Sequence, residues 1–162
     1  MHADLKTALN TQANHELFAA HSYDALSRWC SDLEFDGFAG FFTKQAVEER
    51  EHAGRFLDYL QDRGEQVTLS AIDAPVGTFP TLKDVALHAL ELEQTNTAKI
   101  HACYKAAVAT DEIAALPFLL QFIEEQVEEE AWADKMVTMV ARCECPGAQL
   151  SLDRHLEKIL GA

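Results

Sequence analysis

Cysteines and long hydrophobic runs are scarce in this sequence, and each scarcity excludes a class of protein. Four cysteines in 162 residues do not make a disulfide framework. Cys143 and Cys145 are the only close pair, and no second pair or neighbouring histidine completes a zinc site, so we expect reduced thiols. No segment is apolar enough to span a membrane, and residues 1–4 do not lead into a secretion segment. We therefore expect a cytoplasmic protein with no membrane partner.

Basic residues are also few. The 13 lysines and arginines are outnumbered by 27 aspartates and glutamates, which gives a formal net charge of −14. This balance argues against nucleic acid as a partner and favours cations. The chain length and the 48% hydrophobic content suit one well-filled domain over residues 1–162.

Apolar residues recur three and four positions apart in four long segments, which is typical of amphipathic helices. The first predicted helix covers about residues 4–32. The apolar stripes of the next three run over residues 38–59, 82–107 and 115–140. Four helices of this length, each with one apolar face, predict an all-α bundle over about residues 4–142.

The predicted connections between these helices are short, long and short. Asp36-Gly37 breaks the apolar pattern and marks the first connection. Asp111-Glu112 leaves only a short turn between the third and fourth helices. Residues 65–80, with two prolines and a glycine, are too many for a tight turn. This order is typical of a four-helix bundle with one long crossover. A short amphipathic segment at about 149–160 predicts a small fifth helix.

Polar residues interrupt each apolar stripe near its middle. The same offset of 77 residues carries Glu16 onto Glu93, and the pair Glu49 and His52 onto Gln126 and Glu129. A lone Glu-x-x-His is weak evidence, because it occurs in many solvated helices. The repetition of polar residues at the 77-residue offset, on the inner stripes of all four predicted helices, indicates one buried polar site.

The residue types at this site indicate divalent metal ions. Positions three apart lie one helical turn apart on adjacent ridges, so Glu49 and His52 can reach one ion. Four carboxylates in a dry core would cost several kcal/mol each or become neutral, and cations remove that cost. Oxygen donors with one imidazole suit Fe(II), Mn(II) or Zn(II). A glutamate from each of two helices and a ligand pair from each of the others is the di-iron carboxylate arrangement.

Two further groups lie beside the predicted site. Tyr23 follows Glu16 by seven residues, so its phenol either has a role at the site, where it bonds a ligand carboxylate or passes an electron to bound oxygen, or is an ordinary core hydroxyl. Glu48, Glu125 and Glu128 form either a third, weaker cation site or a solvated acidic face.

The chain resembles bacterial non-haem ferritin over nearly its whole length. The segments that carry the resemblance match in order and spacing: Asn14-His15-Glu16-Leu17-Phe18, Arg28-Trp29-Cys30, Glu48-Glu49-Arg50-Glu51-His52, Leu92-Glu93-Gln94 and Glu125-Gln126-Val127-Glu128-Glu129. The resemblance implies a ferritin-like four-helix bundle with a short fifth helix. It also implies oxidation of Fe(II) by dioxygen or hydrogen peroxide, and storage of ferric oxide inside a hollow shell of twenty-four subunits.

The same resemblance implies roles for individual residues. One iron would be held by Glu16, Glu49 and His52, and the second by Glu49, Glu93 and Glu129 with Gln126 close by. A third iron site would be formed by Glu48, Glu125, Glu128 and Glu129, and Tyr23 would be the family's tyrosine. Gln121 stands where the best-known bacterial members have a tryptophan, so electron donation from that position is not expected. Trp132 is expected on a different helix face and is not an obvious substitute.

Other families with related bundles fit less well. Bacterioferritin has a second Glu-x-x-His and a haem-ligating methionine where this chain has Gln126-x-x-Glu129 and Arg50, so we expect no haem. Rubrerythrin-like peroxidases carry an extra cysteine set, and miniferritins place ligands between subunits. A metal-binding bundle without turnover stays open as an alternative of a different class.

Overall fold

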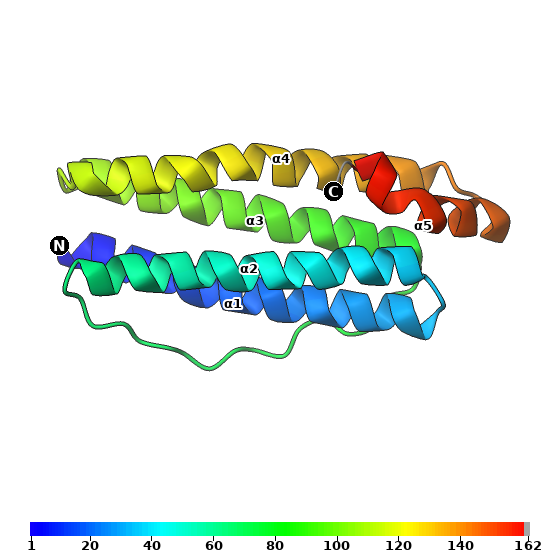
Figure 1. Cartoon of the computed structure of the whole chain (residues 1–162), viewed down its shortest axis with the longest axis horizontal. Helices are drawn as coiled ribbons and strands as arrows, with labels where there is room; N and C mark the ends of the chain where they lie inside the picture. The colour runs from blue at the N-terminus through cyan, green and yellow to red at the C-terminus, as the bar shows by residue number, and fades with distance from the viewer. Residues whose placement is uncertain (161–162) are drawn as a thin grey trace.

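Helices account for nearly all of the regular structure in the computed structural model, which describes residues 1–160. They are α1 (Ala3–Asp32), α2 (Asp36–Asp62), α3 (Leu82–Ala109), the single 3-10 turn η1 (Ile113–Ala115), α4 (Leu116–Ala141) and α5 (Pro146–Leu160). Figure 1 shows four long helices side by side with α5 at one end. The predicted all-α bundle is confirmed, and residues 1–160 contain no strand.

Local capping explains where the long helices begin and end. Thr81 accepts a hydrogen bond from the Asp84 backbone N–H at 3.3 Å and starts α3, as its sequence position predicts. The expected break at Asp36-Gly37 is displaced, because both residues belong to α2. The turn lies instead at residues 33–35, where Glu34 adopts a left-handed conformation (φ 62°) that ends α1.

The long crossover is tied to α1 by two asparagine side chains. Asn10 and Asn14 both donate to the Thr68 carbonyl, at 3.0 and 2.8 Å, and accept from the backbone N–H groups of Thr68 and Ser70. These bonds satisfy backbone groups that a helix or strand would otherwise pair. Figure 1 shows the segment running along α1 from the end of α2 to the start of α3.

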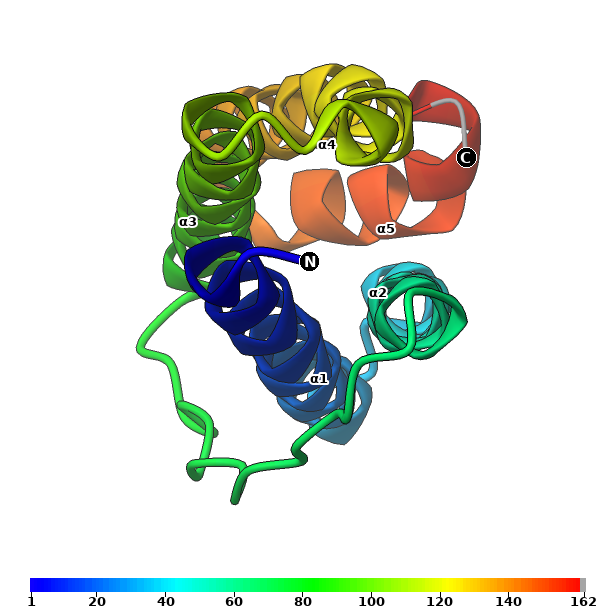
Figure 2. The same cartoon turned by 90° about the vertical axis from the view of Figure 1, so that its left-hand side faces the viewer.

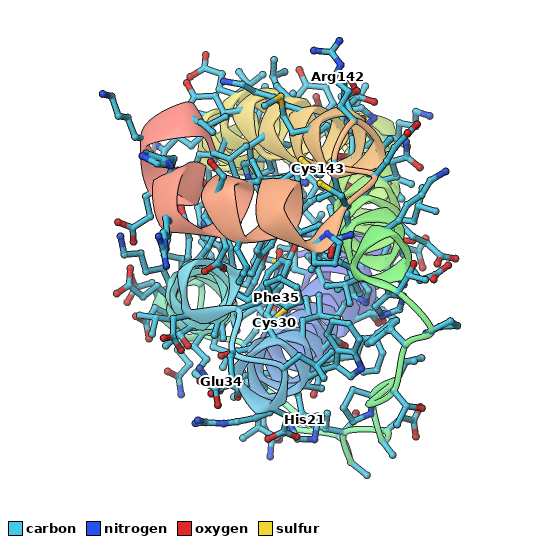
Figure 3. The ribbon with its side chains drawn as sticks, turned by 90° about the vertical axis from the view of Figure 1, so that its right-hand side faces the viewer. His21, Cys30, Glu34, Phe35, Arg142 and Cys143 are labelled. Atoms are coloured by element: carbon cyan, nitrogen blue, oxygen red, sulfur yellow. The ribbon has the colours of Figure 1, made fainter. Side chains whose placement is uncertain are left out.

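Helix α5 crosses one end of the bundle and docks on the beginning of α2. Asp153 accepts a hydrogen bond from the Phe38 backbone N–H at 2.9 Å, so a carboxylate distant in sequence caps α2. A Cβ on Gly37 would lie 1.9 Å from the Asp153 carbonyl oxygen, so this contact requires glycine. Figure 3 shows Phe35 and Cys30 beneath α5, and Arg142 pointing away from the bundle.

A buried polar layer divides the hydrophobic core into two parts. One part includes Tyr23, Ala46, Leu92 and Trp132, and lies toward α5. The other lies toward the chain's N-terminus and consists of Leu5, Leu9, Ala13, Phe56, Leu60, Ile100, Cys103, Ala107, Ala115, Leu119 and Phe122. The positions that separate them on every long helix are those of the predicted metal site.

The helices do not pack equally on all sides. Close backbone contacts join α1 to α2, α3 to α4 and α1 to α3, whereas α5 contacts both α2 and α4. The end-on view in Figure 2 shows α5 lying between α2 and α4. Within residues 1–160, no helix has the length and apolar character needed to cross a bilayer.

Candidate metal centre

Six predicted ligands lie together in the polar layer, and each is at most 7% exposed. Helix α1 contributes one, α2 two, α3 one and α4 two: Glu16, Glu49, His52, Glu93, Gln126 and Glu129. The amphipathic pattern places them there, because each stands on the inward stripe of its helix. The structure therefore brings all six to one level of the bundle.

The tightest cluster consists of Glu16, Glu49 and His52, whose ligand atoms lie within 4.8 Å of one another. Glu49 Oε2 lies 3.4 Å from His52 Nδ1, and neither atom has a hydrogen-bond partner. Buried polar atoms are rarely left unpaired, because each loses its hydration without compensation. A cation coordinated by both atoms would supply the missing interaction, so these residues fit a metal ion.

Two buried amides hold Glu16 in place. Gln12 Nε2 donates to Glu16 Oε1 at 2.8 Å and to Asn96 Oδ1 at 2.6 Å, while Asn96 Nδ2 donates to Glu16 Oε2 at 3.0 Å. Bonds of this kind orient a ligand from behind. Sequence reasoning assigned no role to either amide, although both are polar residues on inward stripes, four before Glu16 and three after Glu93.

Glu93 is held from two sides. The Tyr23 hydroxyl donates to Glu93 Oε1, and Gln126 Nε2 donates to Glu93 Oε2 at 3.2 Å. Gln126 Nε2 also lies 3.1 Å from the Thr97 hydroxyl oxygen. Of the two interpretations of Tyr23, the structure therefore supports the bond to a site carboxylate, and the partner is on α3.

The expectation that Trp132 lies on a different helix face is wrong. Its indole Nε1–H donates to Glu129 Oε2 at 2.5 Å, and the side chain is only 9% exposed. Residues three apart are neighbours on the helix surface, so Trp132 lies one turn beyond Glu129 on the same side of α4. The same spacing that links Glu49 to His52 was thus a usable signal for this tryptophan.

The residues of the predicted third site are only partly brought together. Glu48, Glu128 and Glu129 line one cavity of about 210 Å³ with Gln45, Phe41, Trp132 and Leu160. Glu125 does not line it. Arg55 Nη1 donates to both Glu125 oxygens, at 3.0 and 2.9 Å, and Nη2 donates to Gln121 Oε1 at 3.1 Å.

Burial raises the pKa of the carboxyl groups in the layer. The pKa of Glu93 rises to about 7 and that of Glu129 to about 8, chiefly because desolvation disfavours the charged forms. For Glu16 and Glu49 the pKa lies well above its usual range, for the same reason and because each faces a further carboxylate. The layer therefore holds protons when no cation is bound and releases them when cations bind.

Comparisons with known proteins agree with this geometry. The family model described as a ferritin-like domain matches residues 6–143. The "Bacterial non-heme ferritin" of Staphylococcus haemolyticus is 41% identical over 128 residues, covering 79% of this chain and 77% of the relative. An open pore ferritin from Archaeoglobus fulgidus has a TM-score of 0.93 at 30% identity, covering 96% of this chain and 97% of that one. A PmFTN variant soaked in iron has a TM-score of 0.91 at 31% identity, covering 94% and 98%. The chain therefore belongs to the ferritin family, as a relative of the bacterial non-haem ferritins.

Proposed function

We propose that this chain is an iron-storage ferritin that oxidises Fe(II) to Fe(III) in its buried polar layer. The observation that carries the proposal is the pair of unpartnered atoms, Glu49 Oε2 and His52 Nδ1, in a layer of four buried carboxyl groups. A stable core does not retain such groups without a compensating charge. Family membership supports iron as the cation, and the iron-soaked PmFTN variant is a structural neighbour of the chain.

The layer holds two irons, which are the substrate of the reaction. Glu16, Glu49 and His52 bind the first, and Glu49, Glu93 and Glu129 bind the second, with Gln126 close by. Glu49 bridges the two positions, because its carboxyl group is close enough to Glu16, Glu93 and Glu129 to interact with all three. The two positions are inequivalent, since only the first has an imidazole.

The chain contributes positioning and proton release, while the electrons come from the iron. Gln12 and Asn96 fix the direction of Glu16, and Tyr23 fixes that of Glu93. Two Fe(II) ions supply the two electrons that convert dioxygen and two protons into hydrogen peroxide, or hydrogen peroxide and two protons into two waters. Protons displaced from the raised carboxyl groups as iron binds are available for this step.

A third cation position lies beside the layer, in the cavity lined by Glu48, Glu128 and Glu129. Glu125 is held by Arg55 in the metal-free chain, so its participation would require that ion pair to open. Breaking the Arg55–Glu125 ion pair would cost free energy, and this cost would lower the affinity for a cation that Glu125 helps to bind. We therefore expect the third position to bind iron more weakly than the first two.

The remaining parts of the proposal concern assembly and surroundings. Membership of the family supports a cytoplasmic shell of twenty-four subunits with ferric oxide inside. The net charge of −14 attracts Fe(II) and disfavours nucleic acid and anionic membranes as partners. Haem is not expected, because Arg50 stands where the haem-binding relatives have a methionine; a Soret band in the purified protein would contradict this.

Rapid mixing tests the catalytic proposal against a passive metal-binding bundle. Apoprotein loaded anaerobically with two Fe(II) per subunit is mixed with dioxygen or with hydrogen peroxide, and ferrous iron is followed with a chelating dye. We expect loss of Fe(II) much faster than in protein-free buffer. Bound iron that stays ferrous with both oxidants would show that the bundle holds metal without turnover.

A further inference from the structure

We propose that Trp132 is a one-electron donor to the iron site, used when the bound iron supplies too few electrons for the oxidant. The inference rests on the proposed iron oxidation. It concerns the electron balance of that reaction, because peroxide needs two electrons and a subunit that holds a single Fe(II) supplies one. A nearby oxidisable side chain decides where the missing electron comes from.

The position of the indole supports this role. Trp132 Nε1–H donates at 2.5 Å to Glu129 Oε2, so one hydrogen bond joins the ring to a carboxylate of the second iron position. The ring also lines the cavity that contains Glu48 and Glu128. A reactive oxygen species formed at the irons or at the third position therefore meets this ring at close range.

Aromatic packing places a second oxidisable ring next to the first. The ring centroids of Trp132 and Tyr23 are 6.4 Å apart, and Tyr23 donates its own hydrogen bond to Glu93. Phe41 packs edge-on against the indole at 4.8 Å between ring centroids, and the Trp132 side chain is only 9% exposed. Indole and phenol lose one electron more readily than the phenyl ring, so these two side chains are the donors in the layer.

A purely structural role for Trp132 explains less. A buried indole needs a partner for its N–H, and a backbone carbonyl would serve equally well. Here the partner is a carboxylate of the iron layer. Trp29, the other tryptophan of the chain, packs edge-on against Phe79 at 5.9 Å between ring centroids and makes no hydrogen bond to any of the six layer residues, so it provides a natural comparison.

The step balances with hydrogen peroxide as the oxidant. Its O–O bond breaks, and it takes up two electrons and two solvent protons to leave as two waters. Fe(II) gives one electron and becomes Fe(III). Trp132 gives the other and becomes an indole radical cation, whose Nε1–H stays hydrogen-bonded to Glu129. The next Fe(II) returns an electron to the ring.

The test uses the assembled protein with one Fe(II) per subunit, mixed with hydrogen peroxide and freeze-quenched for electron paramagnetic resonance. Wild-type protein made with ring-deuterated tryptophan should show a radical whose hyperfine splitting is narrower than in unlabelled protein. Trp132→Phe should lose this tryptophan signal and release more spin-trapped hydroxyl radical. The matched control Trp29→Phe should retain the signal at wild-type intensity.

Four results would overturn the inference. A radical unaffected by tryptophan deuteration would assign the electron to another side chain. A tryptophan radical that survives in Trp132→Phe but disappears in Trp29→Phe would assign the radical to Trp29 instead. Normal iron oxidation with no protein radical would leave the proposed function intact and remove only the role of Trp132, whereas failure of wild-type protein to oxidise iron at two Fe(II) per subunit would refute both.

Discussion

Removal of the Glu129 charge should make the metal-free protein less sensitive to high pH. Glu129→Gln keeps the shape of the side chain and an oxygen that can accept from the Trp132 indole, but it cannot ionise. In wild-type protein the pKa of Glu129 is raised from 4.5 to about 8, mainly by burial. Folding therefore favours the protonated form of Glu129, and ionisation of Glu129 destabilises the folded chain.

The sign and size of the effect follow from proton linkage. A carboxyl group with a raised pKa binds its proton more tightly in the folded chain, so stability is lost as pH rises above 4.5 and levels off above about 8. At about 1.4 kcal/mol for each pH unit, the full loss is about 5 kcal/mol, of which about 3 kcal/mol falls between pH 6 and pH 9. For a chain of this length that corresponds to a fall of roughly 6–12 °C in Tm.

Calorimetry of chelator-treated protein at pH 6 and pH 9 measures this difference. The Tm of wild type should be roughly 6–12 °C lower at pH 9 than at pH 6 because of this group, and Glu129→Gln should lack that part of the decrease. Glu124→Gln, which removes an exposed carboxylate of the same helix, is the matched control and should behave as wild type. Equal pH dependence in wild type and Glu129→Gln would refute the burial argument. Anaerobic Fe(II) should reverse the trend, because cations replace the protons.

Three further predictions concern other parts of the chain. Glu49→Ala should slow Fe(II) oxidation at two irons per subunit by more than the roughly 10- to 100-fold that is typical when only a hydrogen-bond partner of a ligand is removed, since in the proposed site Glu49 bridges both positions; stopped-flow rates check this. Glu128→Ala should alter later turnover or iron release while the first oxidation phase survives, and collapse of that phase would contradict the separate third position. Gly37→Ala should lower Tm and expose α5 to proteases because its Cβ meets Asp153, whereas Gly40→Ala, with open space around it, should be stabilising by about 0.5–1 kcal/mol.

The arrangement of the six ligands was predictable because helical periodicity is a local property of the sequence. Glu16 and Glu93 interrupt otherwise apolar stripes, and the three-residue spacing of Glu49 and His52 places both on one side of a helix. The loop lengths then restricted the bundle to one long crossover. The same local rules placed the ends of the four long helices to within a few residues.

Helix α5 shows why other features were not predictable. Its docking depends on Asp153 reaching the first turn of α2, a contact between residues 115 positions apart, and on Gly37 admitting the backbone of α5. Neither residue belongs to a periodic pattern. No local rule gives the direction in which a short helix leaves the end of a bundle.

The hydrogen-bond partners of the ligands were settled only by the packed helices. Gln12 and Asn96 donate hydrogen bonds to Glu16, Arg55 bonds Glu125, which does not line the acidic cavity, and Trp132 donates to Glu129. A stripe shows which face of a helix turns inward, but the side chain that each group meets depends on the rotation and distance of the neighbouring helix. The sequence thus specified which chemistry is buried, and the tertiary packing decided which atoms remain free to bind iron.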